Sequence, residues 1–142
     1  MNVATIRDGL KARVALVTSL RHTYDTVPNG EVVVPAAVVV PDDDFVSYAE
    51  TIGAGIVTLR FRVTLLASMG SDRTAQDRLD AYLSTGTGVT SSVVDALIGD
   101  RTLGGAASTT VVTRAGDYGI TEVAGNRYWK VDLFVSVTAR RA

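Results

Sequence analysis

The sequence predicts an α+β fold: a largely antiparallel or mixed β-sheet with an N-terminal helix and two central helices packed on one face. Two long stretches, 56–68 and 127–139, alternate apolar with polar residues, which is typical of strands with one buried face. Apolar residues at helical spacing before residue 20 and between 72 and 99 predict the helices. The length of 142 residues fits one ordinary domain, so we expect a single domain over 1–142.

The first predicted helix is amphipathic, because apolar residues recur at helical spacing from Ile6 to Val17. We expect Thr5 and Asp8 to form its capping box and the helix to end near residue 20.

The segment after this helix predicts a short strand and then an irregular loop. A β-branched run over 36–40 lies between Pro35 and Pro41, and proline suits the edge of a sheet or the start of a strand. Residues 42–55 hold three aspartates, two aromatics and two glycines, so we expect a long contact loop there.

The central part predicts a strand followed by two helices. In the strand 56–68, alternate side chains from Val57 to Leu65 share the buried face. A helix is expected over 72–84 with Ser71 or Asp72 as its cap, and a short one begins at a Ser92–Asp95 capping box and stops at Gly99. The solvent face of the strand then carries Thr58, Arg60, Arg62 and Thr64.

The last third predicts strands over 111–113, 118–123 and 127–139, with a turn over 124–126. Trp129 belongs to the buried face of the final strand. The glycine-rich run 99–105 lacks both the dinucleotide and the Walker patterns, so we interpret it as a linker.

Composition limits the classes of function. Hydrophobic residues make up 46% and charged residues 20%, as in a compact fold, and a net charge of −1 argues against a dedicated nucleic-acid binder. The chain has no cysteine, which excludes disulfides and thiolate metal sites. Charges near the N-terminus argue against a signal peptide, and Arg60 and Arg62 interrupt the most apolar stretch, so we expect no membrane span and assembly in the cytoplasm.

No residue pattern predicts catalysis, a cofactor or a metal site. His22 is the only histidine and has no evident nucleophile beside it. The Asp42–Asp44 run lacks the glycine and the distal glutamate of a calcium loop. Three interpretations of it remain: a solvated turn, a surface that repels DNA phosphates in a channel, or a surface that contacts a partner's basic patch. Arg60 and Arg62 fit either a solvated sheet surface or a subunit interface. We therefore expect a protein that is not an enzyme.

Short runs along the chain carry a family resemblance. They are Ser71-Asp72-Arg73, Ala75-Gln76, Arg78-Leu79-Asp80, Tyr82-Leu83, Arg101-Thr102-Leu103-Gly104-Gly105, Asp117-Tyr118-Gly119 and Gly125-Asn126-Arg127-Tyr128. In these runs and in the order of its predicted elements, the chain resembles the tail terminator proteins of long-tailed, siphovirus-like bacteriophages, particularly of bacteriophages that infect actinobacteria.

This resemblance implies a homohexameric ring at the tail-neck junction of a virion, assembled in the host cytoplasm. The ring would cap the tube of the major tail tube protein, stop its polymerisation and join it to the head-tail connector or stopper protein. Genomic DNA would pass through the lumen without specific binding. Two alternatives are another neck protein, such as a head-closure or stopper protein, and a non-viral small α+β binding domain, which would need a convergent polar pocket. The candidate interface or lumen residues are Asp42, Asp43, Asp44, Phe45, Tyr48, Arg60 and Arg62.

Overall fold

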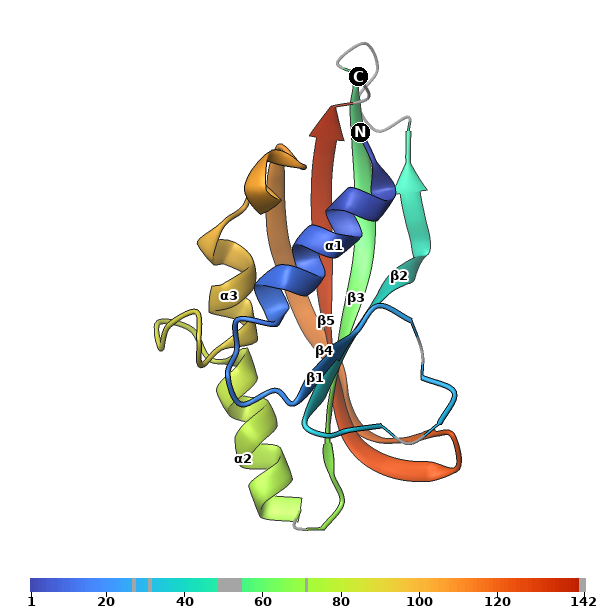
Figure 1. Ribbon diagram of the computed structural model, residues 1–142, viewed down its shortest axis with the longest axis vertical. Helices are drawn as coiled ribbons and strands as arrows, with labels where there is room; N and C mark the ends of the chain where they lie inside the picture. Colours follow the sequence, from blue (N-terminus) through green and yellow to red (C-terminus); the bar gives the residue numbers. More distant parts are fainter. Residues whose placement is uncertain (27, 31, 49–54, 71, 141–142) are drawn as a thin grey trace.

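A mixed sheet with helices on one face makes up residues 1–26, 28–30, 32–48, 55–70 and 72–140, which the computed structural model describes (Figure 1). The strands of this part lie in the order β1-β2-β3-β5-β4, with β1 parallel to β2 and the other neighbours antiparallel. The predicted α+β class is therefore confirmed. The elements are α1 (Val3–Val14), β1 (His22–Tyr24), β2 (Ala36–Ser47), β3 (Ile56–Ser68), α2 (Asp72–Leu83), α3 (Val93–Gly99), the 3₁₀ turn η1 (Leu103–Gly105), β4 (Thr109–Val123) and β5 (Asn126–Arg140).

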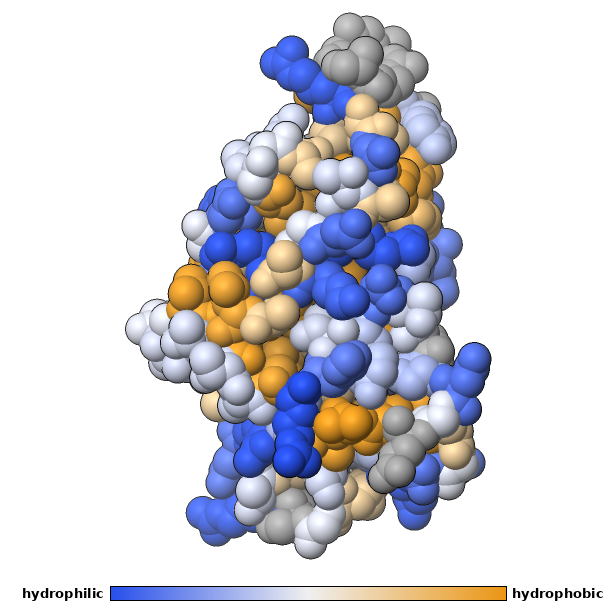
Figure 2. All heavy atoms as spheres, in the orientation of Figure 1, coloured by the Kyte–Doolittle hydropathy of each residue, from blue (hydrophilic) through white to orange (hydrophobic). Residues whose placement is uncertain are grey.

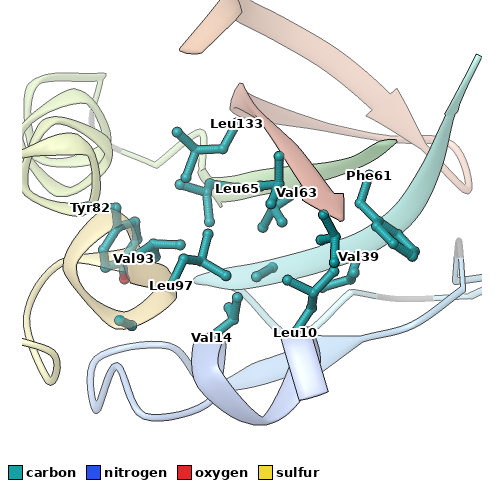
Figure 3. Packing of buried hydrophobic residues seen from close by; sticks show 14 of the residues in the cluster. Leu10, Val14, Val39, Phe61, Val63, Leu65, Tyr82, Val93, Leu97 and Leu133 are labelled. Carbon is teal, nitrogen blue, oxygen red and sulfur yellow. The ribbon is translucent and has the colours of Figure 1, made fainter. Parts of the chain in front are cut away.

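The core lies between the sheet and the helices (Figure 3). The alternation predicted for 56–68 is confirmed, because Val57, Leu59, Phe61, Val63 and Leu65 are all fully buried. Burial of each such side chain stabilises the fold by about 1.5–3 kcal/mol. The helices complete the core with Leu10 and Val14 from α1, Leu79 and Tyr82 from α2, and Val93 and Leu97 from α3. On their outer side, hydrophilic and apolar patches alternate (Figure 2).

The start and end of α1 differ from the sequence prediction. Asn2, not Thr5, caps the helix, since the Asn2 side chain accepts a hydrogen bond from the Thr5 backbone N–H at 3.0 Å. The helix ends at Val14, and Val17 is buried from the turn that follows it.

Strand β2 is longer than predicted, and the prediction of a loop over 42–55 is wrong for residues 42–47. Residues 42–47 continue the strand, while residues 49–54 and the candidate cap Ser71 lie outside the described residues. Pro41 is tolerated inside the strand because β1 pairs only with residues 36–38, which leaves Pro41 on a free edge in the described chain.

The last two strands form one long hairpin. The two short strands predicted over 111–123 are a single strand, β4, whose pairing with β5 is interrupted by register shifts at 112/114 and 116/119. The predicted turn is present, and Ala124 and Gly125 adopt its left-handed backbone conformation.

Candidate interaction surface

The sheet face opposite the helices, which we call the open face, carries the predicted polar residues of β3. Arg60 and Arg62 are half-buried, although no helix of the described chain packs on this side. One end of the face is covered by a second small apolar cluster that includes Val32, Val38 and Tyr128. Val32 and Val34, together with Val123 and Tyr128 of the β4–β5 hairpin, therefore shield part of this face from solvent.

The acidic run forms a bulge on β2. Pro41 pairs with Phe61 and Val46 pairs with Leu59, so residues 42–45 lie opposite the single residue Arg60. The structure brings Asp44 and Arg60 together, with 3.5 Å between the Asp44 carboxylate oxygen Oδ2 and the Arg60 nitrogen Nη1. The Asp44 side chain is 84% exposed, so this ion pair contributes little to stability.

The two candidate aromatic residues have different environments. Phe45 turns towards the core and meets the Phe61 ring edge-on at 5.1 Å between ring centres. Tyr48 is 60% exposed. Phe45 thus anchors the bulge, whereas Tyr48 is the candidate aromatic that is accessible to a partner.

A buried carboxylate on the open face was missed by the sequence analysis. Asp132 of β5 is 2% exposed and accepts a hydrogen bond from the Thr64 hydroxyl at 2.7 Å. Its other carboxylate oxygen lies 3.0 Å from the Lys130 ammonium. The signal available in the sequence is the pairing of two alternating strands, which places Thr64 directly opposite Asp132.

Arg62, Lys130 and Asp132 line a hollow of about 260 Å³ on the open face, which we call the open-face hollow. Its lining also includes Val38 and Val40 of β2, Pro28, and Asp117, Thr121 and Val123 of the β4–β5 hairpin. Arg114 lies nearby and stacks on the Phe134 ring, with the guanidinium carbon 3.7 Å from the ring centre. A separate hollow of about 410 Å³ lies between β3, the start of α2 and the segment around Pro35, and is lined by Arg21 and Arg78 among others.

Two carboxylates fix the shape of the glycine-rich turns. Backbone N–H groups of Gly88, Gly86 and Thr87 donate to Asp95 and lower the pKa of its carboxyl. The Thr102 hydroxyl and the Gly104 N–H do the same for Asp100. Ser92 caps α3 as predicted, but Asp95 holds the preceding loop and does not complete the expected capping box.

One run that carries the family resemblance has a structural role. Asp117 adopts a left-handed backbone conformation with φ of 54°, and the next residue, Tyr118, packs its ring at 6.3 Å from Trp129. The Tyr118 hydroxyl lies 3.3 Å from the Asp80 carboxylate, and burial, followed by this negative charge, raises the pKa of the phenol. The run therefore ties the hairpin to α2.

No protein-family model and no curated protein matches the chain. Within the described residues, no group of three or more His, Cys, Asp or Glu side chains is arranged to hold a metal ion. No helix of that part of the chain is long and apolar enough to cross a membrane.

Proposed function

We propose that this protein is a structural virion protein of a long-tailed bacteriophage, a tail terminator that forms a hexameric ring on the end of the tail tube. In this role it stops tube polymerisation and joins the tail to the head connector. The observation that carries the proposal is the open face: a rigid sheet with half-buried charged residues and no helix of the described chain covering it.

A surface of this kind supports a role in assembly. Half-buried arginines at the centre of a rigid sheet resemble the residues enriched in protein interfaces. Asp132 is paired with Lys130 and accepts a hydrogen bond from the Thr64 hydroxyl, so the open face carries a polar network held in a defined geometry. Ring proteins need rigid, repeated contacts, and these residues can supply them without a nucleophile.

The experiment that tests the proposal combines light scattering with negative-stain microscopy. The purified protein is measured alone and after mixing with tail tube protein from the same virus. A mass of six subunits, or rings at tube ends together with shorter tubes, is the expected result. A monomer that leaves tube length and tube ends unchanged refutes the proposal. Binding to purified portal-side connector protein instead would assign it to another part of the neck.

A further inference from the structure

The hollow of about 410 Å³ beside α2, which we call the basic hollow, gathers cationic and hydroxyl side chains. It lies between the segment that joins α1 to β1, the residues before β2, the end of β3 and α2, which occupies the lower part of Figure 1. Its polar lining residues are Ser19, Arg21, Ser68, Thr74 and Arg78. None of the described residues in the lining is acidic, whereas the open-face hollow contains two carboxylates.

Neither arginine of the basic hollow is neutralised within the described part of the chain. Arg21 and Arg78 make no ion pair and no side-chain hydrogen bond with any described residue. Two acids of α2 lie towards the hairpin instead, because burial and then the charges of Asp80 and Asp77 raise the pKa of the Tyr118 phenol. Two guanidinium groups that share a hollow repel each other, so an anion between them would relieve an unfavourable interaction.

Hydrogen bonds hold the walls of the basic hollow in place. The Arg21 backbone N–H donates to the Pro35 carbonyl at 2.8 Å, which fixes the segment after α1 against the residues before β2. The Ser19 hydroxyl donates to the Tyr82 hydroxyl at 3.1 Å, which joins the same segment to the helix that carries Arg78. A site whose walls are already ordered loses less free energy when a ligand binds.

The lining fits a phosphate group joined to an organic part. Each guanidinium presents paired N–H donors that match two phosphate oxygens, and two guanidinium groups balance a phosphate monoester, whose charge is about −1.5 to −2 at pH 7. The Ser68 oxygen accepts from the Gly70 N–H at 3.2 Å, and its hydroxyl hydrogen has no acceptor among the described residues. Val34, Pro35 and Ala67 add apolar surface. The volume also lies within the range of small-molecule sites, roughly 300–1,000 Å³.

We propose that the basic hollow binds a phosphate monoester of nucleotide size, with the phosphate between Arg21 and Arg78 and the organic part against Val34 and Pro35. This inference goes beyond the proposed function and does not depend on ring formation. A free mononucleotide suits the site better than the backbone of DNA, because an internal phosphate of DNA carries a single negative charge and is joined to a sugar on both sides.

Isothermal titration calorimetry with adenosine 5′-monophosphate as the probe tests the site. We expect one saturable site per chain with a Kd of about 1 mM or tighter, binding of inorganic phosphate at least about threefold weaker, and no binding of adenosine. Arg21→Gln and Arg78→Gln should each weaken binding about tenfold or more, because each removes one charge-assisted contact. Arg78→Lys keeps the charge but not the paired donors, so it should lose less affinity than Arg78→Gln.

Arg73→Gln is the matched control. Arg73 is an exposed arginine of the same helix and does not line the basic hollow, so this variant makes the same change of net charge and should bind the nucleotide like wild type. Arg21 and Arg78 are also exposed, so all the variants should fold, which circular dichroism checks. A wild-type protein that binds the nucleotide but forms no ring would support the site and reject the proposed function.

Four results overturn the inference. The first is the absence of saturable binding by adenosine 5′-monophosphate. The second is an equal loss of affinity in Arg73→Gln and in the two hollow variants, which would show a general effect of charge. The third is adenosine or inorganic phosphate that binds as tightly as the nucleotide. The fourth is displacement of the nucleotide by duplex DNA without terminal phosphates, which would assign the hollow to the DNA backbone.

Discussion

The Lys130–Asp132 pair allows the cost of a buried charge on the open face to be measured. In Lys130→Met the ammonium is lost, and the Asp132 carboxylate keeps only the hydrogen bond from Thr64. Breaking a fully buried pair costs about 3–5 kcal/mol. The Lys130 side chain is 23% exposed, so water replaces part of the interaction and we expect a loss of about 2 kcal/mol.

The second variant restores the balance. Asp132→Asn in the Lys130→Met background removes the uncompensated charge and keeps an oxygen that accepts from the Thr64 hydroxyl. We expect this double variant to recover about half of the lost stability, which corresponds to a coupling energy of about 1 kcal/mol between the two positions.

Urea unfolding at a fixed subunit concentration is the assay, with circular dichroism as the signal because the single tryptophan, Trp129, adjoins the mutated site. With a slope of about 2 kcal/mol/M, Lys130→Met should lower the midpoint by about 1 M. A shift below about 0.25 M, or a double variant less stable than the single one, would refute the reasoning that Lys130 compensates a buried charge.

Three further predictions concern the turns, the core and the bulge. Gly9→Ala should lower the free energy of unfolding by about 1–2 kcal/mol, despite the higher helix propensity of alanine, because the new Cβ would lie 2.9 Å from the Leu103 Cβ. A thermal melt measures this change, and a variant more stable than wild type would contradict the prediction. Because the pKa of the Asp95 carboxyl is lowered, its hydrogen bonds to the preceding loop are complete above pH 3.8, the ordinary pKa, and are lost as pH falls through the lower pKa of the folded protein. The backbone amide chemical shifts of this loop should therefore titrate below pH 3.8 in NMR spectra, and they should not do so in Asp95→Asn. Phe45→Ala should lower the free energy of unfolding by about 1–3 kcal/mol, whereas Tyr48→Ala, at an exposed position, should change it by less than about 0.5 kcal/mol in the same urea titration.

Sequence patterns predicted those structural features that depend only on residues close to one another in the chain. The buried face from Val57 to Leu65 was predicted because strand alternation is a local property, and Ser92 was identified as a cap for the same reason. The sequence analysis missed Asn2 as the cap of α1 because the position of a cap depends on where the helix begins, and Thr5 and Asp8 also have the spacing of a capping box.

The remaining errors come from contacts between distant segments. Pro41 and the aspartates after it are typical of a loop, and only the short pairing of β1 with β2 explains why the strand continues through them. The burial of Asp132 depends on Thr64, which is 68 positions away, and on Lys130 beside it. The open face as a candidate surface followed from Arg60 and Arg62, but its hollow is formed by segments whose proximity no local pattern encodes.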